Sequence, residues 1–110
     1  MKTIKYGRYK LGLVLANYVN NGNLYIGLIT GSGESFADLT INIPNYFFEL
    51  EDEVIINGDV SNDFIKALED LGILINTYKL AYSGFGRYKV MIFNYEIAKD
   101  YVVVDERKEW

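Results

Sequence analysis

Only one stretch of the sequence, residues 61–71, shows a clear helical pattern. Ser61 is suited to cap its amino end, and Gly72 is suited to follow its carboxyl end in a left-handed conformation. The apolar residues that recur on one face of this helix are Phe64, Ala67, Leu68 and Leu71. A single helix cannot supply the repeated crossovers that an all-parallel sheet needs. The pattern therefore predicts an α+β fold with a mostly antiparallel sheet.

The rest of the chain is patterned mainly as strands joined by turns. Apolar and polar residues alternate strictly from Ala37 to Ile43, and Pro44, the only proline, ends that strand. Asn21 and Gly22 indicate a type I′ hairpin turn, because both tolerate positive φ. About five strands are expected, with the helix packed on one face of their sheet. The clearest of them cover residues 10–18, 24–30, 37–43 and 88–93. Residues 4–18 as a whole fit one or two strands, and residues 54–57 could form a brief one.

Other segments carry weaker patterns. Residues 73–81 fit either a strand or an extended loop. Asn94 could cap a short helix over residues 95–101, and the valines at 102–104 favour extended chain because they are β-branched. The apolar face of the main helix should pack on the sheet. The contacts expected there join Phe64, Leu68 and Leu71 to Leu39, Ile41 and either Tyr88 or Val90.

The length and composition of the chain limit the kinds of protein that it can be. A length of 110 residues indicates one domain, placed at residues 1–104, followed by a solvated tail at 105–110. Half of the residues are hydrophobic, which is typical of a globular protein. The apolar run that ends before Asn17 is too short to span a membrane, and the basic residues around it do not suit a signal peptide. These features favour a cytoplasmic protein with no membrane contact.

The sequence contains no histidine and no cysteine, which narrows its chemistry. The usual zinc ligand sets and the Ser-His-Asp and Cys-His nucleophile systems are thereby excluded. Asp59 and Asp63 could bind Mg²⁺, but their spacing equally fits acids at the amino end of a helix. The glycine-rich turn at residues 31–34 leads into a strand and lacks the Lys-Ser/Thr end of a phosphate loop. We expect no enzymatic activity, no cofactor and no metal.

Charge is distributed unevenly along the chain. Residues 34–70 hold ten acidic residues and one basic residue, Lys66, whereas residues 1–33 and 71–93 hold only basic ones. An acidic face could bind a cationic groove and compete there with nucleic acid. The alternative is a solvated loop that keeps the protein soluble. The candidate partner-binding residues combine these acids with their aromatic neighbours: Tyr46, Phe47, Phe48, Glu49, Glu51, Asp52 and Glu53.

A second candidate site combines basic and aromatic side chains, which can hold phosphates and stack on a base. The tetrapeptide Gly-Arg-Tyr-Lys opens an expected strand at residues 7–10 and again at 86–89, and neighbouring strands would bring both copies to one pocket. The alternative is ordinary strand composition, because tyrosine is common in sheets. A net charge of −4 argues against general nucleic-acid binding. The candidate ligand-binding residues are Arg8, Tyr82, Phe85, Arg87 and Lys89.

Three segments carry a family resemblance: GESFADLTINIP at residues 33–44, VIINGDVSNDFIKALEDLGI at 54–73 and YSGFGRYKVMIF at 82–93. Together they resemble a small uncharacterised family found on phages, plasmids and integrative elements of gut and related bacteria. The matching positions are Gly33, Glu34, Phe36, Ala37, Leu39, Thr40, Asn42 and Pro44, then Ser83, Gly84, Phe85, Tyr88 and Phe93. Lys89 departs from the family pattern, which usually has proline there. The resemblance implies a mobile-element context and no known activity.

The resemblance and the charge distribution together lead to a functional expectation. The chain is expected to be a non-enzymatic counter-defence protein of a phage or mobile element, acting in the bacterial cytoplasm. Its most concrete form is an anti-CRISPR-like inhibitor that binds a bacterial defence protein or complex through the acidic face. The alternative is a sponge that binds a cyclic or ADP-ribose-type nucleotide signal through the basic and aromatic residues. Such a sponge would favour a homo-oligomer, because pockets in small domains often form between subunits.

Overall fold

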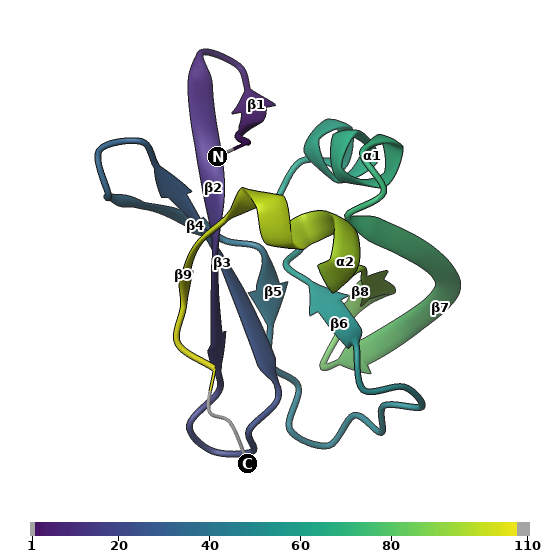
Figure 1. The fold of residues 1–110 in the computed structure, drawn as a ribbon. Helices are drawn as coiled ribbons and strands as arrows, with labels where there is room; N and C mark the ends of the chain where they lie inside the picture. Colours follow the sequence, from purple (N-terminus) through teal and green to yellow (C-terminus); the bar gives the residue numbers. More distant parts are fainter. Residues whose placement is uncertain (1, 108–110) are drawn as a thin grey trace.

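The computed structural model describes residues 2–107, which form two β-sheets with short helices beside them (Figure 1). The larger sheet has five strands, in the order β1-β2-β3-β4, with β9 also paired to β2. Their bounds are β1 Ile4–Tyr6, β2 Tyr9–Asn17, β3 Leu24–Thr30, β4 Ser35–Asp38 and β9 Val102–Asp105. Strands β1 to β4 pair antiparallel, whereas β9 runs parallel to β2. Strands β1 and β9 follow one another along the edge of β2 that β3 does not occupy.

The smaller sheet has four antiparallel strands in the order β5-β6-β8-β7. Their bounds are β5 Thr40–Ile41, β6 Glu53–Ile56, β7 Leu74–Ser83 and β8 Gly86–Phe93. The segment that fitted either a strand or a loop, residues 73–81, therefore belongs mainly to a strand. The α+β class and the mostly antiparallel pairing are confirmed. The strands are nevertheless divided between two sheets instead of lying in a single one.

The chain passes from one sheet to the other at Leu39. This residue is fully buried and separates β4 from β5, so the alternating segment 37–43 is not one strand. The N–H of Leu39 donates to the carbonyl oxygen of Ile26 in β3 (2.9 Å). Its own carbonyl oxygen accepts from the N–H of Asn57, directly after β6 (2.9 Å). Leu39 thus links the two sheets through its backbone as well as through its buried side chain.

The main helix, α1 (Asn62–Asp70), forms where the sequence predicts it. Ser61 Oγ accepts the N–H of Phe64 (3.2 Å), and Gly72 follows the helix with a φ of 83°. At the carboxyl end of the helix, the N–H of Gly72 donates to the carbonyl oxygen of Glu69, and the N–H of the next residue donates to that of Leu68. This pair of hydrogen bonds is a Schellman motif.

The buried face of α1 differs in part from the predicted one. The residues buried within it are Phe64, Ile65 and Leu68. Leu71 is 42% exposed, so its assignment to the core was wrong. The reason is that the helix ends at Asp70 and Leu71 is the cap residue. Ile65, which the helical spacing omitted, is buried instead.

Two hydrophobic clusters lie on opposite faces of the smaller sheet. The main cluster joins both sheets to α1 and holds Phe64, Leu68 and Leu39 together, as predicted. The predicted helix contacts to Ile41, Tyr88 and Val90 are wrong, because these residues belong to the second cluster. That cluster consists of Ile43, Ile55, Ala81 and Val90, with Ile41, Tyr46, Phe48 and Tyr88 packed against it. Adjacent residues of a strand point to opposite faces, which places the second cluster on the outer face of this sheet.

Two local predictions are corrected or refined. The turn between β2 and β3 covers residues 18–23, and only Gly22 has a positive φ (75°), so the type I′ turn at Asn21 and Gly22 does not form. Helix α2 (Tyr95–Ala98) and the 3₁₀ turn η1 (Lys99–Tyr101) lie where a short helix is expected, although Asn94 makes no side-chain cap. Among residues 2–107, no helix has the length and apolar character needed to cross a membrane.

Candidate functional site

A cleft of about 870 Å³ opens between the β2–β3 loop and the smaller sheet. Its walls come from residues 22–24 on one side and from residues 48–53 on another, with the start of α2 and Arg107 completing it. In Figure 1 the β2–β3 loop and the long connection from β5 to β6 lie at the bottom of the molecule. This end of the protein therefore brings the acid-rich part of the chain next to the cleft.

Residues 47–52, here called the acidic segment, are the part of the long connection from β5 to β6 that carries Glu49, Glu51 and Asp52. The carboxylate side chains of Glu49, Glu51 and Asp52 are exposed, and Phe47 and Leu50 are 84% and 52% exposed. The segment is an irregular loop rather than a strand or helix. It therefore displays three acids and two apolar side chains to solvent.

Two of the aromatic residues proposed as partner contacts are instead packed inward. Tyr46 and Phe48 pack on the second hydrophobic cluster. Their two rings also pack edge to face against each other, with centroids 4.9 Å apart. Tyr46 is not among the residues that line the cleft, whereas Phe48 is. These two rings attach the acidic segment to the outer face of the smaller sheet, and Phe47 between them points to solvent.

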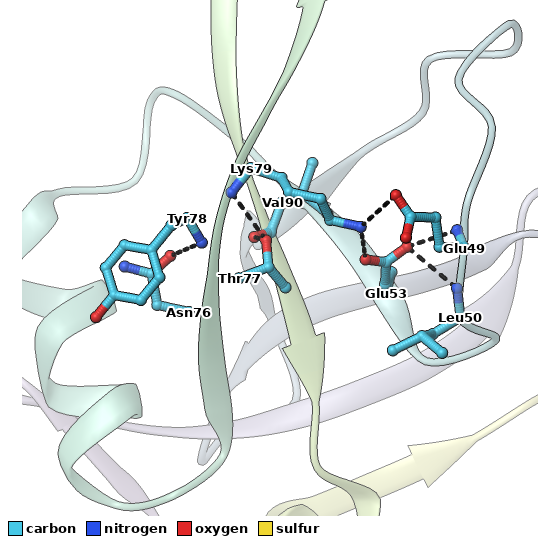
Figure 2. Close-up of polar contacts among 8 residues, drawn as sticks. All are labelled: Glu49, Leu50, Glu53, Asn76, Thr77, Tyr78, Lys79 and Val90. Carbon is cyan, nitrogen blue, oxygen red and sulfur yellow. Dashed lines mark hydrogen bonds and ion pairs between the residues drawn. The ribbon is translucent and has the colours of Figure 1, made fainter.

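Glu53 was expected on the same acidic face, but its side chain is only 1% exposed. One carboxylate oxygen accepts the backbone N–H groups of Glu49 (2.8 Å) and Leu50 (3.2 Å). The other carboxylate oxygen forms an ion pair with Lys79, whose ammonium group also lies 3.4 Å from Glu49 Oε1 (Figure 2). Glu53 therefore holds the backbone of the acidic segment in place from the protein interior and is not part of the exposed acidic surface.

The contacts of Glu53 decide its protonation. Burial alone would raise the pKa of this carboxyl, but Lys79 and the two backbone N–H groups outweigh burial and hold the pKa below its usual value. The same carboxylate raises the pKa of the Lys79 ammonium group. Both groups are therefore charged at neutral pH, and their ion pair is intact there.

A bulge in β7 brings Lys79 to this position. Two extra residues, Thr77 and Tyr78, place Lys79 opposite Val90, on the face that Glu53 shares. Tyr78 has a φ of 61°, which is uncommon for a residue other than glycine, and its N–H donates to Asn76 Oδ1 (2.9 Å; Figure 2). Thr77 Oγ1 donates to the carbonyl oxygen of Val90 (2.6 Å) and accepts the N–H of Lys79 (3.1 Å). The side-chain hydrogen bonds of Asn76 and Thr77 thus support the bulge.

The basic and aromatic candidate residues are only partly brought together. Tyr82 lies directly opposite Arg87 across β7 and β8, and Lys89 is two residues further along β8. Phe85 stands at the tip of this hairpin and is fully exposed. Arg8 lies in the turn between β1 and β2, in the other sheet, with its guanidinium 5.5 Å from the Tyr9 ring centre.

The shared pocket that the two Gly-Arg-Tyr-Lys segments were expected to line depended on neighbouring strands. Strands β2 and β8 belong to different sheets and are not neighbours, so that expectation was wrong. Neither of the two described hollows is lined by any of the five basic and aromatic residues. Among residues 2–107, no group of three or more acidic side chains is arranged to hold a metal ion.

The sequence analysis missed a contact in which Arg107 takes part. The Arg107 guanidinium lies 4.6 Å from the centre of the Tyr95 ring and donates two hydrogen bonds to the Asp105 carboxylate (2.9 and 2.8 Å). The guanidinium lowers the pKa of Asp105. Asp105 belongs to β9, whereas residues 108–110 of the predicted solvated tail lie outside the described residues. Tyr95 and Arg107 are far apart in the chain, so no local spacing indicated their contact.

Most of the chain matches one known protein family. Residues 12–107 match the family described as "Domain of unknown function (DUF4313)". The chain belongs to the DUF4313 family. No curated protein and no solved structure matches it. The expectation of an uncharacterised family is thereby confirmed, and because the description of DUF4313 names no activity, function has to be argued from the site itself.

Proposed function

We propose that this DUF4313 protein acts by stoichiometric binding and has no catalytic activity of its own. In this proposal the acidic segment contacts a basic surface of a protein partner. The observation that carries it is the exposure of Glu49, Glu51 and Asp52 beside the exposed Phe47 and Leu50. Carboxylates steer association with a cationic surface, and large apolar side chains supply much of the binding energy once contact is made.

The way the segment is held supports this function. Binding is weakened by the entropy lost when a mobile loop becomes ordered, and a preorganised loop avoids much of that loss. Here Glu53 accepts the N–H groups of Glu49 and Leu50, while Tyr46 and Phe48 pack on the second cluster. The exposed carboxylates are therefore presented on an irregular backbone that is fixed at several points.

The biological context of the proposal comes from the resemblance in residues 33–44 and 82–93. A mobile-element protein that binds stoichiometrically and displays acids fits an inhibitor of a bacterial defence complex. The most specific form is an anti-CRISPR-like inhibitor, because nucleic-acid-guided complexes contain positively charged channels that an acidic segment could occupy. In this form the carboxylates take positions that nucleic-acid phosphates would otherwise fill.

The experiment is capture of the partner with matched charge variants. The tagged protein is used to isolate its partner from the host, and binding is then measured with Glu51→Lys/Asp52→Lys. Loss of capture is expected, as is weaker binding of the parent protein in salt, since exposed charges are screened over about 10 Å at 0.1 M. The control, Glu34→Lys/Asp59→Lys, makes the same change in net charge at exposed acids outside the acidic segment and should bind normally. Equal capture by both double variants would show that the acidic segment is not the contact.

The β7–β8 hairpin supports a second candidate function, binding of a nucleotide signal. Tyr82 and Arg87 face one another across the hairpin, and neither Arg87 nor Lys89 has an ion-pair partner among residues 2–107. Cyclic and ADP-ribose-type nucleotides should then raise the melting temperature, by the equivalent of about 2.7 kcal/mol at one hundred times the dissociation constant. Arg87→Ala should abolish the shift, and no shift with any nucleotide in the parent protein would remove this candidate.

A further inference from the structure

The cleft beside the acidic segment already contains one guanidinium group. Arg107 lies over the Tyr95 ring at 4.6 Å, and both residues line the cleft. It is the only cationic side chain among the described residues that do so. The remaining charged residues of the lining are all acidic: Glu49, Glu51, Asp52, Glu53 and Glu96. The lining of the cleft is therefore mainly acidic, with one guanidinium placed on an aromatic ring. Lysines outside the lining pair with three of these acids, Lys79 with Glu49 and Glu53, and Lys99 with Glu96.

The backbone that leads into Tyr95 is hydrogen-bonded to the acidic segment. The N–H of Phe93 donates to the carbonyl oxygen of Asp52 (2.8 Å), and the N–H of Asn94 donates to the carbonyl oxygen of Ile73 (2.9 Å). Tyr95 follows these two residues and is the first residue of α2. The backbone just before Tyr95 is thus attached to the carboxyl end of the acidic segment at Asp52 and to Ile73, the residue before β7.

We propose that this cleft is a docking site for an arginine side chain of the basic partner, which takes the place of Arg107 on Tyr95. The proposal rests on the proposed function and adds the chemistry of the contact. The incoming guanidinium stacks on the Tyr95 ring, and the exposed carboxylates of Glu51 and Asp52, which line the same cleft, attract it. Glu96 also lines the cleft but is ion-paired with Lys99 (3.2 Å). Arg107, which also donates two hydrogen bonds to Asp105, acts as an internal competitor that occupies the ring until the partner arrives.

The arrangement selects arginine over lysine for a physical reason. A guanidinium is planar and weakly hydrated, so it stacks on an aromatic face and donates to a carboxylate at the same time. A lysine ammonium is compact and strongly hydrated, and it retains only the attraction to the acids. Ile75, Ile92 and Phe48 also line the cleft, and they offer apolar surface to the methylene groups of the incoming side chain.

The test uses two capped peptides of defined sequence, one with three arginines separated by glycines and the other with lysines in their place. Binding to the full chain is followed by calorimetry and by the NMR signals of the Tyr95 ring. The arginine peptide should bind more tightly by roughly threefold or more, which is the size of an exposed cation–π contact. Tyr95→Leu should remove this preference, and Arg107→Ala should strengthen binding of the arginine peptide more than that of the lysine peptide.

Tyr9→Leu is the matched control, because Tyr9 also carries an arginine over its ring but lies outside the cleft. It should leave the preference for arginine unchanged. Equal affinity for both peptides, binding of neither, or a preference that survives Tyr95→Leu would each overturn the arginine site. The proposed function is tested separately, by capture of the partner from the host. If Glu51→Lys/Asp52→Lys loses the partner while Tyr95→Leu keeps it, the acidic contact stands and the arginine site does not.

Discussion

The two hydrophobic clusters differ in what covers them. The main cluster lies among both sheets and α1, so regular secondary structure surrounds it. The second is smaller, and the irregular connection from β5 to β6 covers it through Ile43, Tyr46 and Phe48. That connection is fixed in addition by the ion pair between the buried Glu53 and Lys79. We therefore expect global stability to depend mainly on the main cluster, and the shape of the acidic segment to depend on the second cluster and the ion pair.

The largest effect is expected from a change in the main cluster. Leu68→Ala removes a side chain that is completely buried and should lower the free energy of unfolding by about 2–5 kcal/mol. Chemical denaturation measures this loss. Leu71→Ala is the control on the same helix, and because Leu71 is 42% exposed, its effect should stay within about 0.5 kcal/mol. Similar losses for both variants would contradict the observed orientation of α1.

A smaller loss is expected at the ion pair. Glu53→Gln preserves the size of the side chain but removes its charge, and it should lower the free energy of unfolding by about 1–3 kcal/mol, the range for a buried hydrogen-bonded group that loses its partner. The N–H groups of Glu49 and Leu50 should exchange with solvent faster, because Glu53 is their acceptor. Glu51→Gln, an exposed neighbour, is the control. Unchanged stability and unchanged exchange in Glu53→Gln would show that this acid does not hold the segment.

The ion pair should also make stability depend on pH. The pKa of Glu53 is lower in the folded protein than its ordinary value of 4.5, so the unfolded chain binds more protons as pH falls. The stability contributed by this carboxylate is therefore fully present above pH 4.5 and is lost as pH falls through the folded pKa. The measurement is the difference in unfolding free energy between the parent and Glu53→Gln from pH 7 down to pH 3. That difference should shrink, whereas a constant difference would mean that the pKa of Glu53 is the same in the folded and unfolded chain.

The smallest effect on stability is expected at the exposed acids. Glu51→Lys/Asp52→Lys should change the free energy of unfolding by less than about 0.5 kcal/mol per site, because both side chains are exposed and lack an ion-pair partner among residues 2–107. The measurement is thermal unfolding of this variant, compared with that of Glu34→Lys/Asp59→Lys. A large drop confined to the first variant would place these acids in the fold itself and would invalidate their use as binding probes.

The elements that the sequence predicted well depend on contacts between near neighbours. Ser61 caps α1 three residues ahead of its hydrogen-bond donor, and Gly72 permits the left-handed conformation that ends the helix. Gly33, with a φ of 89°, likewise lies in the turn predicted at residues 31–34. The division of residues 37–43 at Leu39 was not predictable, because alternation identifies the side-chain face but not the sheet in which each residue pairs.

The candidate site was predicted only in part for the same reason. The sequence alone located the acids at residues 49–53 and the basic and aromatic residues of the β7–β8 hairpin. One local signal for Glu53 was available, because it precedes the apolar run of β6 and shares a face with Ile55, which is buried. Its partner Lys79 arrives only through the bulge in β7, and bulges follow from pairing that the sequence does not reveal.

By itself, the sequence determined the class of the fold, the position of its helix and the separation of acidic from basic segments. These follow from side-chain spacing, caps and turn residues, which act over a few positions of the chain. Only the tertiary structure decided that there are two sheets, that Glu53 is buried while Glu51 is exposed, and that Arg107 lies on Tyr95. Each of these depends on residues distant in the chain meeting in space, because burial and charge pairing are set by the packed fold and not by local pattern.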